Sequence, residues 1–307
     1  MLKKIIFMGT PYFAVSILKS LYQNGYPISV VYTQPPQRSQ RGHKINKSPI
    51  QSISETLNIE FRAPQFLKNN KEEHEYLKKL NADLAIVVAY GKIIPKEILG
   101  LTKKGFINIH ASVLPKWRGA APIQRSIMNL DKKTGISVMK INEKLDAGSI
   151  CSSYSLDLLE NENAESVSNR LSLLAAEKIL DDIDTILEDK AVFRPQNDAM
   201  ATYANKILKS EGKIDWAEPS KNIIGKINGL YPNSFFIYKG ERYKILKAEP
   251  SDKEGKAGNV LNDNLEIACK EGSIKILEIQ REGKLPQKIN QFILGSKIKK
   301  GSNLIDA

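Results

Sequence analysis

The chain has 307 residues, of which 41% are hydrophobic and 26% are charged. These fractions are typical of globular domains and exclude a disordered tail or a fibre. Lys and Arg exceed Asp and Glu by a net charge of +12, which favours a polyanionic partner such as a nucleic acid. A lysine-rich surface that serves only solubility would carry the same surplus, so the charge alone leaves both interpretations open.

Sparse cysteine and the lack of a long apolar run exclude further classes of protein. Cys151 and Cys269 are too few for a disulfide scaffold, and the three histidines are too scattered to suggest a zinc site. The longest apolar run, 84–90, is much shorter than the roughly 18 residues that a membrane span needs. Gly9 interrupts the apolar start too early for a signal peptide. We therefore expect a cytoplasmic monomer that binds no metal and no membrane.

The first half of the chain alternates between short apolar runs and helical periodicity. Apolar runs at 3–8, 28–32 and 84–89 predict buried strands, and helical spacing follows the first of them. A long helix is expected over 164–187, and a domain boundary near residue 190. This alternation predicts an α/β fold with a doubly wound, mostly parallel sheet.

The second half of the chain has a different pattern. A helix is expected over 221–229, and alternating residues from Ser234 to Lys247 surround a turn at 239–241. Short strands separated by turns continue beyond residue 260, which predicts a small antiparallel barrel. Residues 191–307 carry 20 Lys and Arg against 14 Asp and Glu. A basic barrel beside an α/β domain suggests a module that docks a nucleic acid.

The segment 38–48 differs from its surroundings. It combines Arg38, Arg41, His43, Lys44 and Lys47 with a glycine, and its apolar residues show no period. We expect a basic surface loop there, because loops with these properties commonly carry binding functions.

Polar side chains end one predicted strand in the first half. Asn108 and His110 alternate with Ile107 and Ile109, so both polar groups share one face of that strand. The carboxyl ends of strands in open α/β sheets point at the ligand crevice. His110 could instead be a hydrogen-bonded core residue, but its pairing with Asn108 favours a functional role.

A second polar feature follows the strand expected over 135–141. Asp146 lies in the tight turn Leu145-Asp146-Ala147-Gly148, where a small residue and a glycine allow backbone and ligand to come close. An ordinary turn aspartate would look the same. Together with Asn108 and His110, Asp146 would supply an amide donor, an acid or base, and an orienting carboxylate. This trio suits acyl transfer to an amine, because negative charge then develops on oxygen while nitrogen loses a proton.

Several motifs resemble those of the folate-dependent formyltransferases. The residues that carry the resemblance are Asn108-Ile109-His110-Ala111-Ser112-Val113-Leu114-Pro115, Arg118-Gly119-Ala120-Ala121-Pro122-Ile123-Gln124, Val87-Val88-Ala89-Tyr90-Gly91, Leu145-Asp146-Ala147-Gly148 and Gln280-Arg281-Glu282-Gly283-Lys284. The similarity covers nearly the whole chain. The stretch beginning at Trp117 and the late Arg281-Glu282-Gly283-Lys284 motif resemble the branch of the family that acts on tRNA.

The resemblance implies transfer of a formyl group from the co-substrate 10-formyltetrahydrofolate to the methionine amino group of initiator methionyl-tRNA, a step that prepares translation initiation. It assigns catalysis to Asn108, His110 and Asp146. It assigns folate binding to Ser112, Val113, Leu114, Pro115, Val88, Ala89, Tyr90 and Gly91, and tRNA binding to Arg41, Lys44 and Arg38. The fold implied is a Rossmann-like catalytic domain over 1–189, a linker over 190–207 and an OB-like tRNA-binding domain over 208–307.

Three alternatives remain open. A formyltransferase could act on a small amine such as glycinamide ribonucleotide or an amino sugar, although the basic second half argues against it. A catalytically silent RNA-binding protein could retain the fold. A nicotinamide oxidoreductase is disfavoured because Gly9 stands alone after the first strand, where a dinucleotide-binding loop needs three glycines.

Overall fold

The computed structural model describes residues 3–38 and 45–305, which group into two compact units. Unit 1 comprises Met1–Gly119, Thr134–Leu156 and Ser168–Tyr203. Unit 2 comprises Ala120–Lys133, Asp157–Val167 and Ala204–Ala307. The two units therefore interleave along the chain.

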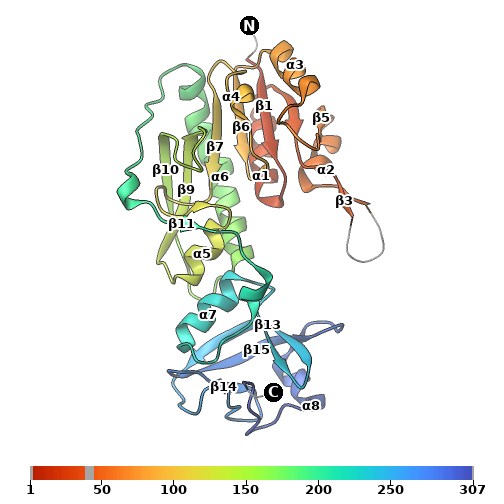
Figure 1. Ribbon diagram of the computed structural model, residues 1–307, viewed down its shortest axis with the longest axis vertical. Coiled ribbons are helices and arrows are strands. Elements are labelled where there is room, and N and C mark those ends of the chain that lie inside the picture. Colours follow the sequence, from red (N-terminus) through yellow and green to blue (C-terminus); the bar gives the residue numbers. More distant parts are fainter. Residues whose placement is uncertain (1–2, 39–44, 306–307) are drawn as a thin grey trace. The chain divides into compact units, whose positions relative to one another are not determined.

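Unit 1 is built on a seven-stranded sheet (Figure 1). In spatial order its strands are β10 (Ile150–Asp157), β9 (Lys133–Lys140), β7 (Phe106–His110), β6 (Leu84–Val88), β1 (Ile5–Gly9), β2 (Ile28–Tyr32) and β5 (Phe61–Arg62). The strands from β7 to β5 pair in parallel, whereas β9 runs antiparallel to β7. The predicted α/β class and mostly parallel sheet are confirmed.

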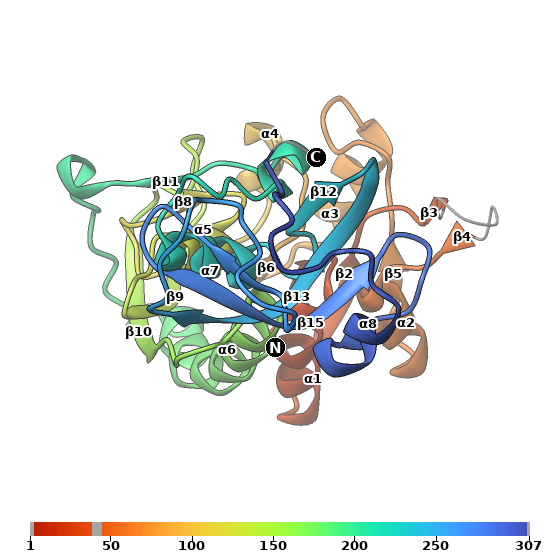
Figure 2. The ribbon, with the colours of Figure 1, turned by 90° about the horizontal axis from the view of Figure 1, so that it is seen from below.

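Helices cover both faces of this sheet, as Figure 2 shows. They are α1 (Tyr12–Gln23), α2 (Pro49–Thr56), α3 (Lys71–Leu80), α4 (Lys96–Leu99) and α6 (Ala164–Leu187). On one face, α6 is tied to α1 by a 2.8 Å hydrogen bond from Ser172 Oγ to the Phe13 carbonyl. On the other face, Leu77 of α3 and Ile98 of α4 pack with Ile6 and Met8 of β1 in a common core. The apolar runs read from the sequence are therefore strands buried on both sides.

Short strands lie within the segment predicted to be a basic loop. Two-residue strands, β3 (Gln37–Arg38) and β4 (Ile45–Asn46), pair in antiparallel fashion on either side of 39–44. Ser48 then caps α2 by accepting a hydrogen bond from the Gln51 backbone N–H at 2.9 Å. The segment 38–48 predicted as a basic loop therefore contains strand residues at Arg38 and at Ile45–Asn46.

Unit 2 contains a curled antiparallel sheet. The strands of this sheet are β12 (Phe235–Tyr238), β13 (Glu241–Ser251), β14 (Glu266–Ala268), β15 (Ser273–Arg281) and β16 (Gln287–Lys288). The helices of unit 2 include α5 (Pro122–Met128), η2 (Lys209–Gly212), α7 (Ser220–Gly229) and α8 (Ile289–Gly295). Lys239 and Gly240 both have positive φ and form the two-residue turn between β12 and β13, as the hairpin pattern predicts. The second, antiparallel part of the predicted fold is confirmed.

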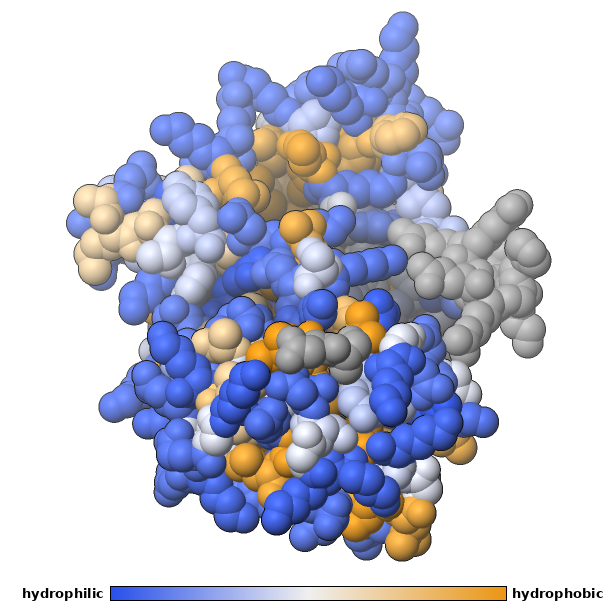
Figure 3. Space-filling model, turned by 60° about the horizontal axis from the view of Figure 1, so that its bottom comes forward, coloured by the Kyte–Doolittle hydropathy of each residue, from blue (hydrophilic) through white to orange (hydrophobic). Residues whose placement is uncertain are grey.

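An aromatic chain fills the core of this sheet. Phe236 stacks on Tyr243 with 5.3 Å between ring centroids, while Trp216 and Phe292 meet them edge-on. Helix α5 packs against α7 at a glycine, because a Cβ on Gly229 would lie 2.6 Å from the Met128 side chain. On the face shown in Figure 3, hydrophilic side chains predominate and hydrophobic ones form small separate groups.

Candidate active site

Strand β7 brings Asn108 and His110 to one face near its carboxyl end. Parallel pairing with β6 and antiparallel pairing with β9 fix the strand on both sides, with His110 opposite Ser137 and Asn108 opposite Met139. The imidazole is 6% exposed and Asn108 is half-buried. The alternation predicted from the sequence therefore places an amide and an imidazole side by side at the end of a rigid strand.

The turn after β9 brings a carboxylate to the same place. Asp146 adopts the left-handed backbone conformation, with φ +46°. A Cβ on Gly148 would lie 1.8 Å from the Lys140 carbonyl oxygen, so only glycine allows the turn to return so close to the end of β9. Asp146 Oδ2 accepts a 2.9 Å hydrogen bond from the Gly119 backbone N–H. The aspartate is thus fixed through both its backbone and its side chain.

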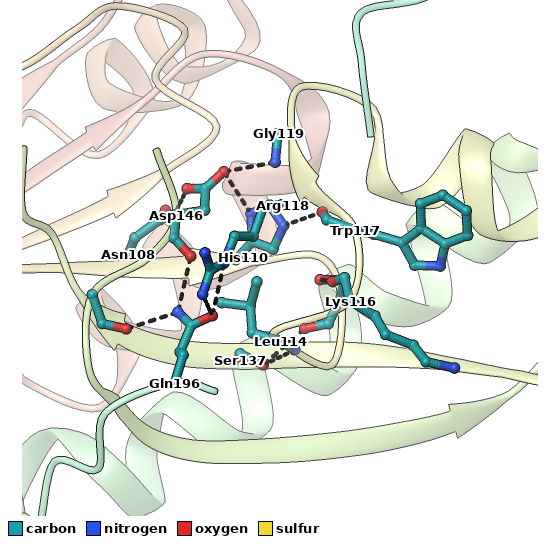
Figure 4. Close-up of polar contacts among 12 residues, drawn as sticks. Asn108, His110, Leu114, Lys116, Trp117, Arg118, Gly119, Ser137, Asp146 and Gln196 are labelled. Carbon is teal, nitrogen blue, oxygen red and sulfur yellow. Dashed lines mark hydrogen bonds and ion pairs between the residues drawn. The ribbon is translucent and has the colours of Figure 1, made fainter. Parts of the chain in front are cut away.

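The three predicted catalytic side chains meet at Asp146 (Figure 4). Asn108 Nδ2 lies 3.4 Å from Asp146 Oδ1, and His110 Nδ1 lies 3.7 Å from Asp146 Oδ2. Both distances are long for a hydrogen bond. The structure therefore brings together the trio read from the sequence, and it holds the donors near the carboxylate without saturating them.

The other ring nitrogen of His110 is engaged with the backbone. Nε2 lies 2.9 Å from the Trp117 carbonyl oxygen. A carbonyl can only accept, so this nitrogen carries a proton and donates it. The imidazole is buried and hydrogen-bonded, as expected for a histidine of the core. Its Nδ1, however, faces the Asp146 carboxylate. Figure 4 shows the Trp117 indole directed away from the trio.

The segment predicted to contact folate after β7 is partly buried. Ser112 and Leu114 are 1% and 5% exposed. Ser112 Oγ donates to the Lys116 carbonyl at 2.6 Å, and Ser137 Oγ bridges the Ser112 carbonyl and the Leu114 N–H. The hydroxyl bridge draws Leu114 onto β9 and buries it. Val113 and Pro115 remain half-buried.

The second predicted folate segment follows β6. The Val88 and Tyr90 side chains are buried, whereas Ala89 and Gly91 are exposed and have positive φ. The Tyr90 carbonyl accepts from Thr10 Oγ1 at 2.8 Å and from Gln34 Nε2 at 3.1 Å. Loops after three parallel strands are thereby joined at one carbonyl.

The predicted tRNA-binding residues are largely outside this description. Arg41 and Lys44 lie outside the described residues, and of Arg38 the backbone is described, in β3. Their predicted role stays a prediction.

Sequence reasoning missed two side chains next to the trio. Arg118 is 3% exposed and contacts Gln196 and Asp198. Its hydrogen bond lowers the pKa of Asp198. Gln196 also donates to the backbone of the Asp146 turn. No sequence period marks the irregular segment that carries Gln196, so pattern analysis offers no signal for it.

Two cavities of unit 1 lie away from the trio. One of about 350 Å³ is lined by Lys103, Lys104, Lys140 and two phenylalanines among others, and one of about 250 Å³ lies between α1 and α2. Geometry among the polar side chains, and not cavity volume, therefore identifies the candidate site. Within 3–38 and 45–305, no three His, Cys, Asp or Glu side chains are arranged to hold a metal ion. Nor does any helix in those ranges have the length and apolarity of a membrane span.

Comparison with known proteins relates both parts of the chain to one family. Residues 3–183 match the formyl transferase family and residues 206–297 match the formyl transferase C-terminal domain. A methionyl-tRNA formyltransferase of Pelagibacter ubique is 63% identical, over 99% of each chain. Another, from Caldanaerobacter subterraneus, is 40% identical over 98% of this chain and 99% of its own.

Solved structures share the fold at lower identity. An N-formyltransferase from Helicobacter canadensis, in complex with folinic acid and dTDP-3-aminofucose, has a TM-score of 0.67 at 18% identity and covers 92% of this chain and all of its own. HypX from Aquifex aeolicus, in complex with tetrahydrofolic acid, has a TM-score of 0.66 at 17% identity, over 96% of this chain and 47% of its own. The near-complete match to curated relatives decides the assignment: this chain belongs to the methionyl-tRNA formyltransferase family.

Proposed function

We propose that this chain transfers a formyl group from 10-formyltetrahydrofolate to the amino group of methionine on initiator tRNA, in the cytoplasm. The observation that carries the proposal is the convergence of Asn108, His110 and Asp146 at one end of β7, in a chain that is 63% identical to a methionyl-tRNA formyltransferase. An amide, an imidazole and a carboxylate are the groups that acyl transfer to an amine requires.

The reaction exchanges one carbon–nitrogen bond for another. The methionine amine attacks the formyl carbon, and negative charge builds on the formyl oxygen. The bond from that carbon to the folate nitrogen then breaks, the amine loses one proton and the folate nitrogen gains one. The chain must therefore stabilise an oxyanion and manage one proton.

Asn108 and His110 are placed for the first task. We assign donation to the oxyanion to Asn108 Nδ2 and to a protonated His110, whose contacts to Asp146 at 3.4 and 3.7 Å are long enough to be exchanged for a substrate atom. A fixed donor of this kind typically contributes about 100- to 1000-fold to the rate. Asp146 orients the imidazole, because its Oδ2 lies 3.7 Å from His110 Nδ1. The charged imidazole then gives its Nδ1 proton to the departing folate nitrogen, and the neutral imidazole that remains accepts the proton that the amine loses.

Folate and tRNA would approach from different parts of the chain. For folate, the exposed main chain at Ala89 and Gly91 and the half-buried Val113 and Pro115 offer backbone donors, acceptors and apolar contacts. For tRNA, we propose Arg38, Arg41 and Lys44 together with the basic domain over 208–307, because Lys and Arg contacts to phosphate dominate nucleic-acid affinity. Residues 1–189 would form the catalytic domain and 190–207 the linker.

A direct assay tests this function. The purified chain is supplied with 10-formyltetrahydrofolate and methionyl initiator tRNA, and the released amino acid is analysed for formylmethionine. Glycinamide ribonucleotide and an amino sugar nucleotide are offered in parallel. We expect formylation of the tRNA alone. Formylation of a small amine, or none by a folded protein that still binds RNA, would overturn the proposal.

A further inference from the structure

Gln196 ties the Asp146 turn to the loop that contacts His110. Its Nε2 donates to the Asp146 carbonyl at 2.9 Å and to the Gly148 carbonyl at 2.8 Å, while its Oε1 accepts from Arg118 Nε at 3.0 Å and from Arg118 Nη2 at 2.8 Å. Both donor positions and the acceptor of this amide are thereby used, as Figure 4 shows.

Gln196 contacts two segments, the turn that carries Asp146 and the loop 117–119 that contacts both His110 and Asp146. The Asp146 backbone on one side carries the carboxylate, and Arg118 on the other side lies between Trp117, whose carbonyl accepts from His110, and Gly119, whose N–H donates to Asp146. Through one side chain, Gln196 therefore links the loop whose Trp117 carbonyl holds the imidazole to the turn that carries the Asp146 carboxylate.

The contacts around Gln196 hold it in place. Arg118 is 3% exposed and also pairs with Asp198 at 2.7 Å, and the Arg118 backbone N–H donates to the Thr202 carbonyl at 2.9 Å. Paired backbone hydrogen bonds between Ile150 and Arg194, at 2.8 and 2.9 Å, fix the same segment on its other side. The glutamine is thus anchored on both flanks by interactions that do not involve the trio.

The Asp146 turn needs such a tie. A non-glycine residue at φ +46° is in an unfavourable backbone conformation that persists only where surrounding structure enforces it. Two hydrogen bonds to carbonyls on either side of Ala147 restrain this turn directly. An error of about 1 Å in the position of a reacting group can cost about 100-fold in rate.

We infer that Gln196 is a positioning residue for formyl transfer, acting through Asp146 and with Arg118 as its fixed partner. The inference rests on the function proposed above. The Gln196 amide fixes the position of the Asp146 carboxylate relative to His110 and Asn108.

Two substitutions separate the donors of Gln196 from its acceptor. Gln196→Met removes both, whereas Gln196→Glu keeps an acceptor for Arg118 and removes the two donors. We expect both variants to lower kcat about 10- to 100-fold with KM for tRNA and folate within about threefold, because the binding surfaces are unchanged. Gln23→Met, at an exposed position at the end of α1, is the matched control and should leave kcat unchanged. Full activity of Gln196→Glu would show that the Arg118 contact alone matters and would overturn the inference.

A double-mutant cycle distinguishes positioning from general support of the fold. In an Asp146→Asn background we expect Gln196→Met to cause little further loss of kcat, because the group it positions is already disabled. A multiplicative loss in the double variant would contradict the inference, as would wild-type kcat in Gln196→Met. Failure of the wild-type chain to formylate tRNA would instead refute the proposed function, so the two failures are distinguishable.

Discussion

Unit 1 contains two clusters of buried polar side chains that are built differently. Around the Glu73 carboxylate, all side-chain contacts are within hydrogen-bond distance: Tyr32 donates at 2.6 Å, and Arg62 donates from Nε and Nη2, each with a contact of 2.8 Å. Around Asp146, the contacts from Asn108 and His110 are 3.4 and 3.7 Å. The first cluster is saturated and suits a structural role. The second has donors close to a carboxylate but not committed to it, as a site that must accept a substrate atom requires.

The electrostatics of the Glu73 cluster agree with a structural role. The hydrogen bond to Glu73 raises the pKa of Arg62, and burial followed by the bond to Glu73 raises the pKa of Tyr32. Arg62 and Tyr32 therefore keep one protonation state at physiological pH, which suits a structural role and not proton transfer.

Replacement of His110 by alanine should give the largest effect on activity. It removes an oxyanion donor and the acid or base together, so we expect kcat to fall about 1000-fold or more. Initial rates of formyl transfer measure this, with tRNA binding checked by filter retention. The control is His74→Ala on α3, which should stay within about twofold of wild type. Equal losses of kcat in both variants would show that His110 has no specific role in formyl transfer.

Asn108→Ala should follow, with a loss of about 100- to 1000-fold in kcat, the usual cost of one oxyanion donor. Because the donation is made to charge that develops in the transition state, KM for tRNA and folate should change little. A variant that raised KM while keeping kcat would mean that Asn108 binds the ground state and does not stabilise the oxyanion.

The Glu73 cluster should respond in stability and not in rate. Glu73→Gln removes one charge of a buried pair, a change that costs about 3–5 kcal/mol when both partners are fully buried. Since the Arg62 side chain is 22% exposed, we expect about 1–3 kcal/mol from urea unfolding, with kcat per folded molecule unchanged. Glu72→Gln removes the contact of an 82% exposed carboxylate with the same arginine and should cost less than about 0.5 kcal/mol. Comparable losses of stability in Glu73→Gln and Glu72→Gln would contradict the distinction between the buried and the exposed carboxylate.

The smallest effect is expected at Asp198, beside the catalytic loops. The hydrogen bond from Arg118 lowers the pKa of this carboxyl below its ordinary 3.8. A lowered pKa in the folded state stabilises the fold above the ordinary value, and this contribution disappears as pH falls through the folded value. Asp198→Asn should therefore unfold at a slightly lower temperature than wild type at pH 7, and the difference should shrink as pH falls below 3.8. A difference that grows on acidification would contradict the assignment.

The sequence was sufficient for the parts of the site that follow a local period. Alternation along β7 placed Asn108 and His110 on one face, and Gly148 marked the turn that carries Asp146. The long helix α6 and the hairpin at Lys239-Gly240 were likewise predictable, since each is specified by its own residues.

The rest depended on contacts between distant segments. Gln196 lies 50 residues from Asp146 in a stretch without regular structure, and a local sequence pattern cannot show that Arg118 has its partners at 196 and 198. Ser137 pulls Leu114 inward across 23 positions in the same way. Such side-chain-to-backbone bonds are set by tertiary structure, and no periodicity encodes them.

Two aspartates of unit 1 provide the most direct test of the central claim. Asp146 belongs to the trio, whereas Asp182, only 7% exposed, accepts hydrogen bonds from Ser152 and Tyr154 in a structural setting. Single-turnover formyl transfer to methionyl initiator tRNA is measured for Asp146→Asn and Asp182→Asn. We predict that the first falls about 100- to 10,000-fold and that the second stays within about twofold of wild type. Similar rates in the two variants would contradict the claim that the carboxylate at 146 organises the reaction.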